Sequence, residues 1–530
     1  MSVFDHIESV VVPKSRFNLS HNNLTSMKMG FLYPTLALEC YPGDYFDITT
    51  KHVVRMQPMF APIMHQINIT HHFFFVPYRL LDKNWEDFIT GGPKGDNNYE
   101  LPTFKPNVGD SGLNSLWDYL GFPLRQDNTY PDVSGVEPII YPFLAYHLIW
   151  NDWYRDEDLQ DDIKENLEDI ENIQKQSWFN SIRPRAWEKD YFTIARPSPQ
   201  KGTAPAIAVN LSGKANVFAD FLNSSGQDVP WHIMAGVTND TYSGSIKSFG
   251  GSSSSQIYAK LFSPSEPGTP SKQLYAQLNG GTAQFDVSQL RLAVQMQKWL
   301  ERNMRAGNRY IEFLLAHFGV APNDARLQRP EYIGGSKSPI ISSEVLQTSA
   351  TGDSTPLGTF AGHGISADKT EASKYSVKEN GVIMCITSCL PRTTYSQGVN
   401  RQWLRRSRYD FYSPEFAHLS EQMVLSGELY ADGTTQQNTQ EFGFQGRFNE
   451  LRYIPNRFGA QMRNNLAYFH LGRWFNERPI LNESFVTANQ VSTNPFAVTN
   501  EDTLICNIGF EIMATRPMPY YPTPGLLDHF

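Results

Sequence analysis

Two hydrophobic patterns near the start of the chain predict strands that differ in exposure. Residues 35–54 (TLALECYPGDYFDITTKHVV) alternate apolar and polar positions around the turn signal Pro42-Gly43-Asp44. Residues 64–80 (MHQINITHHFFFVPYRL) begin with the same alternation and then become continuously apolar. Alternation indicates a strand with one face in solvent, whereas a continuous run indicates a strand covered on both faces. We therefore expect the second strand to end beneath another element.

The segment directly after that strand is the predicted cover. Residues 81–92 (LDKNWEDFITGG) offer Asp82 as a helix N-cap, and Trp85 and Phe88 on one face of a helix. Two glycines then end the pattern. This predicts a short helix that packs over the end of the preceding strand.

Three further stretches have helical patterns. Residues 141–163 are aromatic first and acidic later, and we interpret the acidic run 156–162 as a solvated surface. Residues 286–304 begin with a capping-box spacing and carry an apolar stripe. Residues 310–319 carry a second stripe that a glycine ends. Such stripes belong more often to a core than to a ligand site.

The last third of the chain returns to strand patterns, in residues 381–395 (GVIMCITSCLPRTTY) and 502–519 (DTLICNIGFEIMATRPMP). Residues 201–284 are poor in apolar periodicity and predict a loop or an extension. Strands at the two ends of the chain must pair with each other, because each would otherwise leave an exposed edge. The pattern predicts a mainly β fold, a two-sheet sandwich with large, partly helical insertions.

Composition and charge limit the ligands, disulfide bonds and membrane segments that this chain can have. The formal charge is −9, so any contact with nucleic acid must be a local patch. The four cysteines are too scattered for a disulfide framework, and Cys385 and Cys389 share one face of a strand as small buried side chains. The N-terminal residues carry no signal-peptide pattern, and no run is long and apolar enough to span a membrane.

Motifs for catalysis or cofactor binding are missing from the sequence. It contains no phosphate-binding loop, no nucleophile elbow and no zinc-protease motif. His71 and His72 point to opposite faces of a strand, which argues against a metal site there. We therefore expect no catalytic, cofactor-binding or metal-ligating residues.

One segment could contact single-stranded DNA. Residues 400–412 (NRQWLRRSRYDFY) place arginines among aromatic residues. Guanidinium groups match phosphates, and aromatic faces accept stacked bases. The alternative is a structural arginine cluster that pairs with acids within or between subunits. The candidate residues for DNA contact are Arg401, Arg405, Arg406, Arg408, Trp403 and Tyr409.

Over nearly its whole length the sequence resembles the major capsid proteins of the Microviridae, small icosahedral single-stranded DNA phages, and especially their gokushovirus type. The most specific match is residues 318–340 (FGVAPNDARLQRPEYIGGSKSPI). This stretch is irregular, and no general structural requirement would make unrelated proteins share it. The other matching segments follow in the family's order: residues 73–88 (FFFVPYRLLDKNWEDF), 145–161 (AYHLIWNDWYRDEDLQD), 189–202 (KDYFTIARPSPQKG), 356–364 (PLGTFAGHG), 406–422 (RSRYDFYSPEFAHLSEQ) and 515–530 (TRPMPYYPTPGLLDHF).

The resemblance implies a structural protein and no enzyme. The implied fold is one domain over residues 1–530, an eight-stranded antiparallel jelly roll (the viral capsid β-barrel) with very long insertions. About sixty copies would self-associate into a T=1 icosahedral shell around circular single-stranded DNA. The expected location is the virion, after assembly in the cytoplasm of the host bacterium.

The resemblance also implies partners. These are an internal scaffolding protein, a DNA pilot protein, a small basic DNA-binding protein, the packaged single-stranded DNA and a bacterial surface receptor. Residues 203–285 match the family's variable insertion, which forms protrusions at the threefold axes, and we expect them to be exposed and to serve host attachment. The rival interpretations are a secreted carbohydrate-active β-sandwich enzyme and a stand-alone receptor-binding spike.

Overall fold

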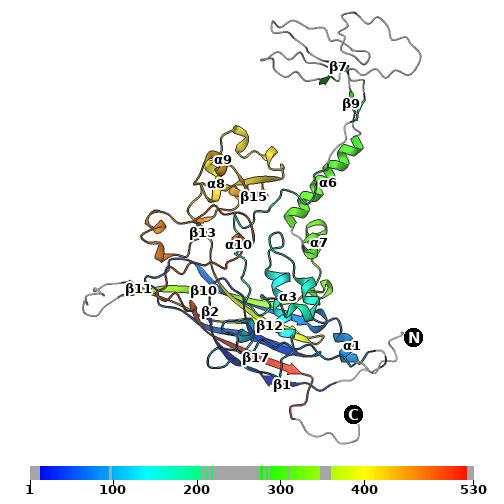
Figure 1. The fold of residues 1–530 in the computed structure, drawn as a ribbon, viewed down its shortest axis with the longest axis vertical. Coiled ribbons are helices and arrows are strands. Elements are labelled where there is room, and N and C mark those ends of the chain that lie inside the picture. The colour runs from blue at the N-terminus through cyan, green and yellow to red at the C-terminus, as the bar shows by residue number, and fades with distance from the viewer. Residues whose placement is uncertain are drawn as a thin grey trace, which may run out of the picture. The chain divides into compact units, whose positions relative to one another are not determined.

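The fold is given by a computed structural model (Figure 1). It describes residues 12–92, 94, 98–205, 210–212, 216–218, 275–277, 282–284, 287–306, 309–346 and 360–521. The chain divides into two compact units. One consists of Met1–Gly202 with Leu300–Phe530, and the other of Thr203–Trp299.

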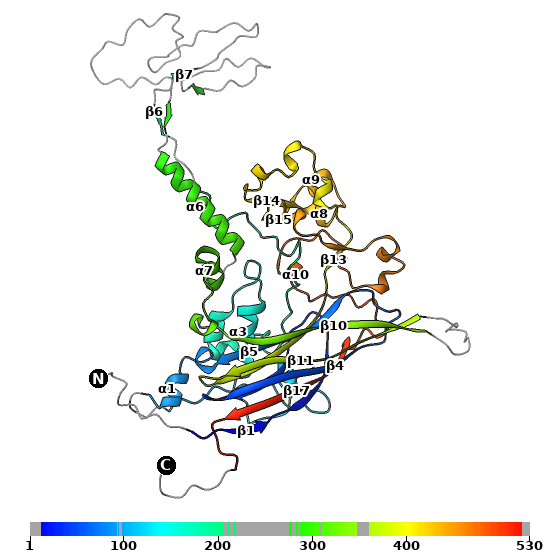
Figure 2. The same cartoon turned by 180° about the vertical axis from the view of Figure 1, so that it is seen from behind.

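The larger unit is built on one antiparallel sheet. In the described residues it has nine strands, in the order β1-β17-β4-β11-β10-β5-β12-β3, and β2 also pairs with β17. Figure 2 labels six of them, β1, β17, β4, β11, β10 and β5, in the view from behind. Their bounds are β1 (Ser15–Asn18), β2 (His21–Met27), β3 (Tyr33–Cys40), β4 (Tyr45–Met56), β5 (Ile67–Pro77), β10 (Glu331–Leu346), β11 (Phe360–Ser376), β12 (Gly381–Pro391) and β17 (Leu504–Arg516).

The last strand lies beside the first ones. Strand β17 pairs with β4 on one side and with β1 and β2 on the other. The prediction that strands from the two ends of the chain pair with each other is therefore confirmed, as is the mainly β fold class.

The sheet curls because two long strands each change partner along their length. The first part of β10, Glu331–Ile340, pairs with β5, and its second part, Ile341–Leu346, pairs with β11. Most of β11 then pairs with β4. Side chains from β3, β5 and β12 meet side chains from β4 and β17 in a first hydrophobic core.

Strand β5 is buried on both faces, as its continuous apolar run predicts. Phe73 and Phe75 belong to the first core, whereas Phe74 and Val76 belong to a second core on the other face of the sheet. All four side chains are at most 1% exposed. The expectation of a strand covered on both faces is confirmed.

The cover itself differs from the prediction. Helix α1 (Trp85–Thr90) is short and has no buried residue, and Trp85 only packs against the edge of the second core. The main cover is α3 (Tyr141–Ile149), of which every residue except Pro142 is buried. Helix α3 is almost entirely apolar and therefore has no face suited to water. It covers the face of β5 that carries Phe74 and Val76, whereas α1 lies at the edge of the second core.

The acidic run is also more buried than the sequence suggests. The carboxylates of Asp156, Glu157 and Asp158 pair with Lys189, Arg309 and Arg196 at 2.5, 2.6 and 2.8 Å. Their side chains are only 9%, 9% and 17% exposed. The interpretation as a solvated surface is wrong for these three residues, because their partners come from segments distant in the sequence.

Two middle helices are where the patterns predict them, as α6 (Val287–Ala306) and α7 (Tyr310–Phe318). The predicted capping residue Asp286 lies outside the described residues. Among the described residues, no side chain of the two apolar stripes, residues 292–300 and 311–318, is buried. Leu292 and Trp299 on α6 are 61% and 50% exposed, and Phe318 on α7 is 68% exposed.

The described residues of the unit Thr203–Trp299 form two short ladders and the first part of α6. Strand β6 (Asn210–Ser212) pairs with β9 (Thr282–Gln284), and β7 (Asn216–Phe218) pairs with β8 (Tyr275–Gln277). The prediction for residues 203–285 falls largely outside the described residues.

A third core joins the connection between β12 and β17 to residues around Phe192, in the connection between β5 and β10. It joins Phe192 and Tyr395 to Val424, Phe442 and Phe485. The short elements around it are β13 (Thr394–Tyr395), β14 (Glu421–Leu425), α8 (Ser426–Leu429), α9 (Thr435–Asn438), β15 (Glu441–Gly446), β16 (Asn456–Arg457) and α10 (Glu483–Val486). This region carries the arginine–aromatic segment.

The small polar and sulfur side chains of the sheet lie as predicted. All four cysteines are buried and free, and Cys385 and Cys389 both enter the first core. His71 points into the first core, whereas His72 bonds to the Tyr154 hydroxyl on the other face. The expectation that these two histidines face opposite ways is confirmed.

His71 connects the two halves of the curled sheet. Its Nε2 lies 3.2 Å from Nδ1 of His52 on β4, and its Nδ1 lies 2.8 Å from the Thr387 hydroxyl on β12. Burial, and then the neighbouring His52 and His72, lower the pKa of His71 to about 3. Burial likewise lowers the pKa of His72 to about 4 and that of His147 to about 3.

These pKa values predict acid sensitivity. In the unfolded chain a histidine has a pKa of about 6.5, so below that pH the unfolded state binds protons that the folded state refuses. The free energy of unfolding should therefore be unaffected by these groups above about pH 6.5 and should fall as the pH drops towards 4. We expect the change in thermal midpoint between pH 7 and pH 5 to be smaller for His71→Gln than for the unmodified chain. His21→Gln, at an exposed position, is the matched control, and equal pH dependence of the two variants would contradict the expectation.

Candidate nucleic-acid interface

The arginine–aromatic segment, residues 400–412, is held by its own polar side chains. It contains two single turns, η4 (Arg401–Trp403) and η5 (Arg408–Asp410). The Asn400 side chain accepts a hydrogen bond from the Gln402 N–H at 3.1 Å. The Asp410 carboxylate accepts bonds from the N–H groups of Ser407 and Arg406, at 2.7 and 2.9 Å, and these bonds lower its pKa. These hydrogen bonds fix the backbone of the segment locally.

Arg401 is engaged by a buried acid. Its Nη1 donates to Glu428 Oε1 at 2.7 Å and to the Met423 carbonyl at 2.9 Å. The Glu428 side chain is 1% exposed and also accepts bonds from the Tyr191 hydroxyl and the Leu425 N–H. This ion pair joins the segment to the third core.

Arg405 forms a second pair of the same kind. Its Nη2 donates to Glu450 Oε1 at 3.1 Å, and the Gln422 side chain donates to the other carboxylate oxygen. The Arg405 and Glu450 side chains are 14% and 4% exposed. Arg401 and Arg405 therefore have the intramolecular acid partners that the structural interpretation predicts.

The other four candidates lie at the surface. Trp403 and Tyr409 are 73% and 52% exposed, and Arg406 and Arg408 are also exposed. The Arg408 guanidinium lies 4.8 Å from the centre of the Tyr409 ring and donates to the Tyr409 hydroxyl. Neither Arg406 nor Arg408 forms an ion pair with a carboxylate in the described part of the chain. These residues can offer two cations and two aromatic faces to a ligand.

A second segment, absent from the sequence-based candidates, forms the opposite wall of this surface. A pocket of about 520 Å³ is lined by Arg401 and Trp403 together with Tyr453, Arg457 and Arg463. The last three come from residues 447–463 (RFNELRYIPNRFGAQMR), where arginines recur every five or six positions among aromatic residues. That spacing is visible in the sequence, but nothing local shows that it faces residues 400–412.

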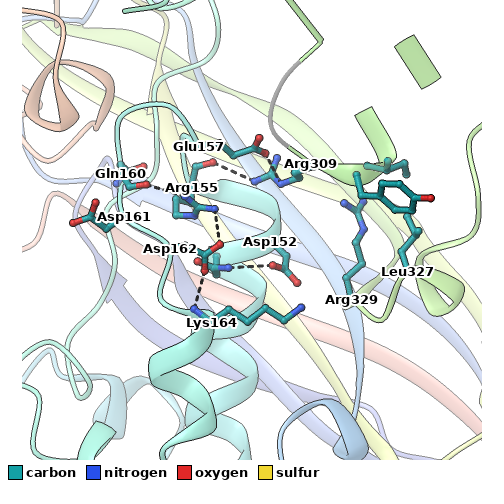
Figure 3. Close-up of a pocket in the computed structure, with 13 residues that line it drawn as sticks. Asp152, Arg155, Glu157, Gln160, Asp161, Asp162, Lys164, Arg309, Leu327 and Arg329 are labelled. Atoms are coloured by element: carbon teal, nitrogen blue, oxygen red, sulfur yellow. Dashed lines mark hydrogen bonds and ion pairs between the residues drawn. The ribbon is translucent and has the colours of Figure 1, made fainter. Parts of the chain in front are cut away.

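A second hollow, of about 580 Å³, lies beside the acidic run (Figure 3). Its charges largely satisfy one another. Glu157 pairs with Arg309, and Asp162 accepts a bond from Arg155 at 3.1 Å. Nowhere among the described residues do three or more histidine, cysteine, aspartate or glutamate side chains form a group that could hold a metal ion.

Within the part of the chain that the structure describes, no helix combines the length and the apolar character needed to cross a membrane.

Comparisons with known proteins all find similarity to phage capsid proteins, over nearly the whole chain. A family model described as "Capsid protein (F protein)" matches residues 5–526. Capsid protein VP1 of Chlamydia phage 1 is 32% identical over 589 residues, which cover 99% of this chain and 97% of the relative. VP1 of Bdellovibrio phage phiMH2K is 32% identical, with 99% and 98% covered, and VP1 of Spiroplasma virus 4 is 30% identical, with 97% and 96% covered.

The ion pair between Arg401 and Glu428 should contribute to the stability of the folded chain. Arg401→Ala leaves the buried Glu428 carboxylate without its cation, although Tyr191 and the Leu425 N–H still bind it. We expect the free energy of unfolding to fall by about 3 kcal/mol, at the low end for one broken partner of a buried pair. Arg406→Ala, at an exposed position, should cost less than about 0.5 kcal/mol. Urea unfolding followed by fluorescence measures both values.

The charge itself can be tested with a third variant. Glu428→Gln combined with Arg401→Ala removes the orphaned charge and should recover part of the lost stability. Equal destabilisation by Arg401→Ala and Arg406→Ala would show that the Glu428 pair does not hold the segment.

Proposed function

The chain belongs to the phage capsid protein (F protein) family, and from this premise we propose that about sixty copies assemble into a closed T=1 shell around circular single-stranded DNA. A structural role in a phage capsid, rather than an enzymatic one, follows from the family itself. The match of the capsid family model across residues 5–526 supports this proposal. The enzyme and the stand-alone spike are set aside on that ground.

The architecture supports a jelly roll as the shell-forming fold. The sheet is antiparallel and curled, and most neighbouring strands in it are not consecutive in sequence. For example, β17 pairs with β4, and β12 pairs with β3, although several hundred residues separate the two strands of each pair in the sequence. We propose that this sheet is the family's eight-stranded capsid β-barrel with additional edge pairing.

Exposed apolar side chains supply surfaces for contact between subunits. On and after α7, Tyr310, Leu315, Phe318 and Val320 are 64%, 55%, 68% and 56% exposed. A lone soluble chain rarely presents so many large apolar side chains within eleven residues, whereas interfaces between subunits bury them. We propose that a second copy of the chain covers this region in the shell.

Because the net charge is negative, the chain can contact DNA only through a local group of cationic residues. A chain of −9 cannot neutralise phosphates with its bulk charge. We propose that Arg406, Arg408, Trp403 and Tyr409 contact the DNA directly, while Arg401 and Arg405 hold the segment in place. Cations and the small basic partner would neutralise the remaining phosphates. The internal scaffolding protein and the DNA pilot protein belong to the same proposal, as does assembly in the host cytoplasm.

Electron microscopy of the purified recombinant chain, with and without the scaffolding protein, tests the shell. We expect uniform closed particles in at least one of the two conditions. The variant Leu315→Glu/Phe318→Glu should keep the thermal midpoint of the unmodified chain and yet form no closed particles, because charge is costly in an apolar interface. Monomers of the unmodified chain under both conditions would contradict the proposal.

The insertion generates a separate prediction. We propose that residues 203–285 face outward and bind the receptor on the bacterial surface. Replacing them with a short glycine–serine linker should leave closed particles in electron micrographs. The same particles should no longer sediment with host cells that bind particles of the unmodified chain. Loss of assembly, or unchanged sedimentation, would contradict the role in attachment.

A further inference from the structure

Two strands of the large sheet continue beyond it as a two-stranded ribbon. Strand β10 pairs with β5 only as far as Ile340, and its remaining part, Ile341–Leu346, pairs with β11. Figures 1 and 2 both show these ends of β10 and β11 extending past the other strands. A ribbon of two strands has two outer edges, and each edge carries backbone N–H and C=O groups that need partners.

The chain closes one of these edges itself. On the side of β11 that faces away from β10, Met59 and Gly362 exchange backbone hydrogen bonds of 3.1 and 3.0 Å. The Ile63 N–H also donates to the Ser342 hydroxyl of β10 at 2.9 Å. These bonds hold the ribbon against the larger unit, so its shape is set before any partner binds.

The other edge, along β10, has no strand beside it among the described residues. Natural proteins usually protect such an edge with lysine, proline or a bulge. Residues 341–346 (ISSEVL) contain no lysine or proline and pair with β11 without a register shift, and Glu344 is their one charge. Ile341, Val345 and Leu346 are 66%, 47% and 47% exposed. An unprotected edge with exposed apolar side chains indicates a strand that another strand covers in the assembled protein.

We propose that this edge of β10 pairs with the same edge of a second copy, antiparallel, about a twofold axis at Ser343. Such an axis keeps every side chain on its own face, so opposed residues are both odd-numbered or both even-numbered. Centring on Ser343 places Ile341 opposite Val345 of the second copy, a cross-strand pair of β-branched side chains. Centring on Glu344 would place two carboxylates directly opposite each other, which destabilises a sheet. Charge therefore selects the register centred on Ser343.

This pairing makes one sheet out of two copies. Ile365 of β11 already lies opposite Ile341, so apolar side chains continue from β11 across β10 into the second copy. The inference rests on the proposed shell function and deepens it, because it names one contact between copies and the axis on which the contact lies. An icosahedral shell contains twofold axes, and a self-complementary edge is the kind of contact that such an axis requires.

A cysteine at the proposed axis tests the pairing in the full-length chain. Mild oxidation of Ser343→Cys should give a disulfide-linked dimer on a non-reducing gel, because opposed residues of antiparallel strands have Cα atoms about 4.5–5.5 Å apart. The four native cysteines are buried and do not compete for this link. Val136→Cys, at a position 77% exposed, is the matched control.

Two further variants test the register. Ile341→Cys and Val345→Cys should crosslink to each other in a mixed sample, whereas neither should crosslink to itself. Equal crosslinking of Ser343→Cys and Val136→Cys, or no crosslink in the mixed sample, would overturn the proposal. A cover made by a different strand of the second copy, or by a different protein, would give these results.

Opposite charges at the axis provide an independent test. Ser343→Lys and Ser343→Glu each place like charges opposite each other and should weaken self-association about fivefold in sedimentation velocity. Mixing the two variants places a lysine opposite a glutamate and should restore the association of the unmodified chain, which also shows that both variants are folded. Val136→Lys should associate like the unmodified chain. Unchanged association of both Ser343 variants, or a loss that mixing does not restore, would contradict the twofold pairing.

Particle formation keeps this inference separate from the proposed function. Closed particles of the unmodified chain, together with no disulfide link in Ser343→Cys, would overturn the edge pairing and leave the shell standing. Disulfide-linked dimers of Ser343→Cys, together with no closed particles of the unmodified chain, would support the edge pairing and contradict the shell.

Discussion

Strand β5 carries large side chains into two cores at once, and the rest of the larger unit is arranged around this double burial. One face, with Phe73 and Phe75, needs the curled sheet to close over it. The other face, with Phe74 and Val76, needs a helical cover, which α3 provides. A polar substitution in β5 would thus disturb both the closure of the sheet and the seating of the insertion between β5 and β10.

The charged residues fall into two groups, those that form ion pairs within the chain and those that remain available to a ligand. The acids near the surface of this chain are often occupied: Asp156, Glu157 and Asp158 hold basic residues from remote segments, and Glu428 and Glu450 hold two arginines. Such pairs add little stability over apolar packing, but they fix which segments meet. Arg457 and Arg463, which form no ion pair among the described residues, line one pocket together with Trp403. A chain with net negative charge can therefore keep a local cationic surface.

The sequence predicts local features well and distant contacts poorly. The continuous run in β5, the opposed His71 and His72, and the spans of α6 and α7 all follow from periodicity, which the backbone itself imposes. The choice of α3 rather than α1 as the main cover depends on where the chain returns, and no local pattern contains that information. Within the candidate site, residues 400–412 are recognisable by composition. Their pairing with Glu428 and Glu450, and their meeting with Arg457 and Arg463, arise from contacts across tens of residues.

The position of β17 sets the timing of folding during translation. This strand is synthesised long after β4, which ends at Met56, yet it lies between β4 and the pair β1 and β2. At about 5–20 residues per second, β4 waits roughly 20–90 s for its partner. Throughout that time the nascent chain carries an unpaired strand edge and an incomplete first core. The sheet can therefore close only after β17 has been synthesised, so contacts made early in synthesis cannot complete the first core.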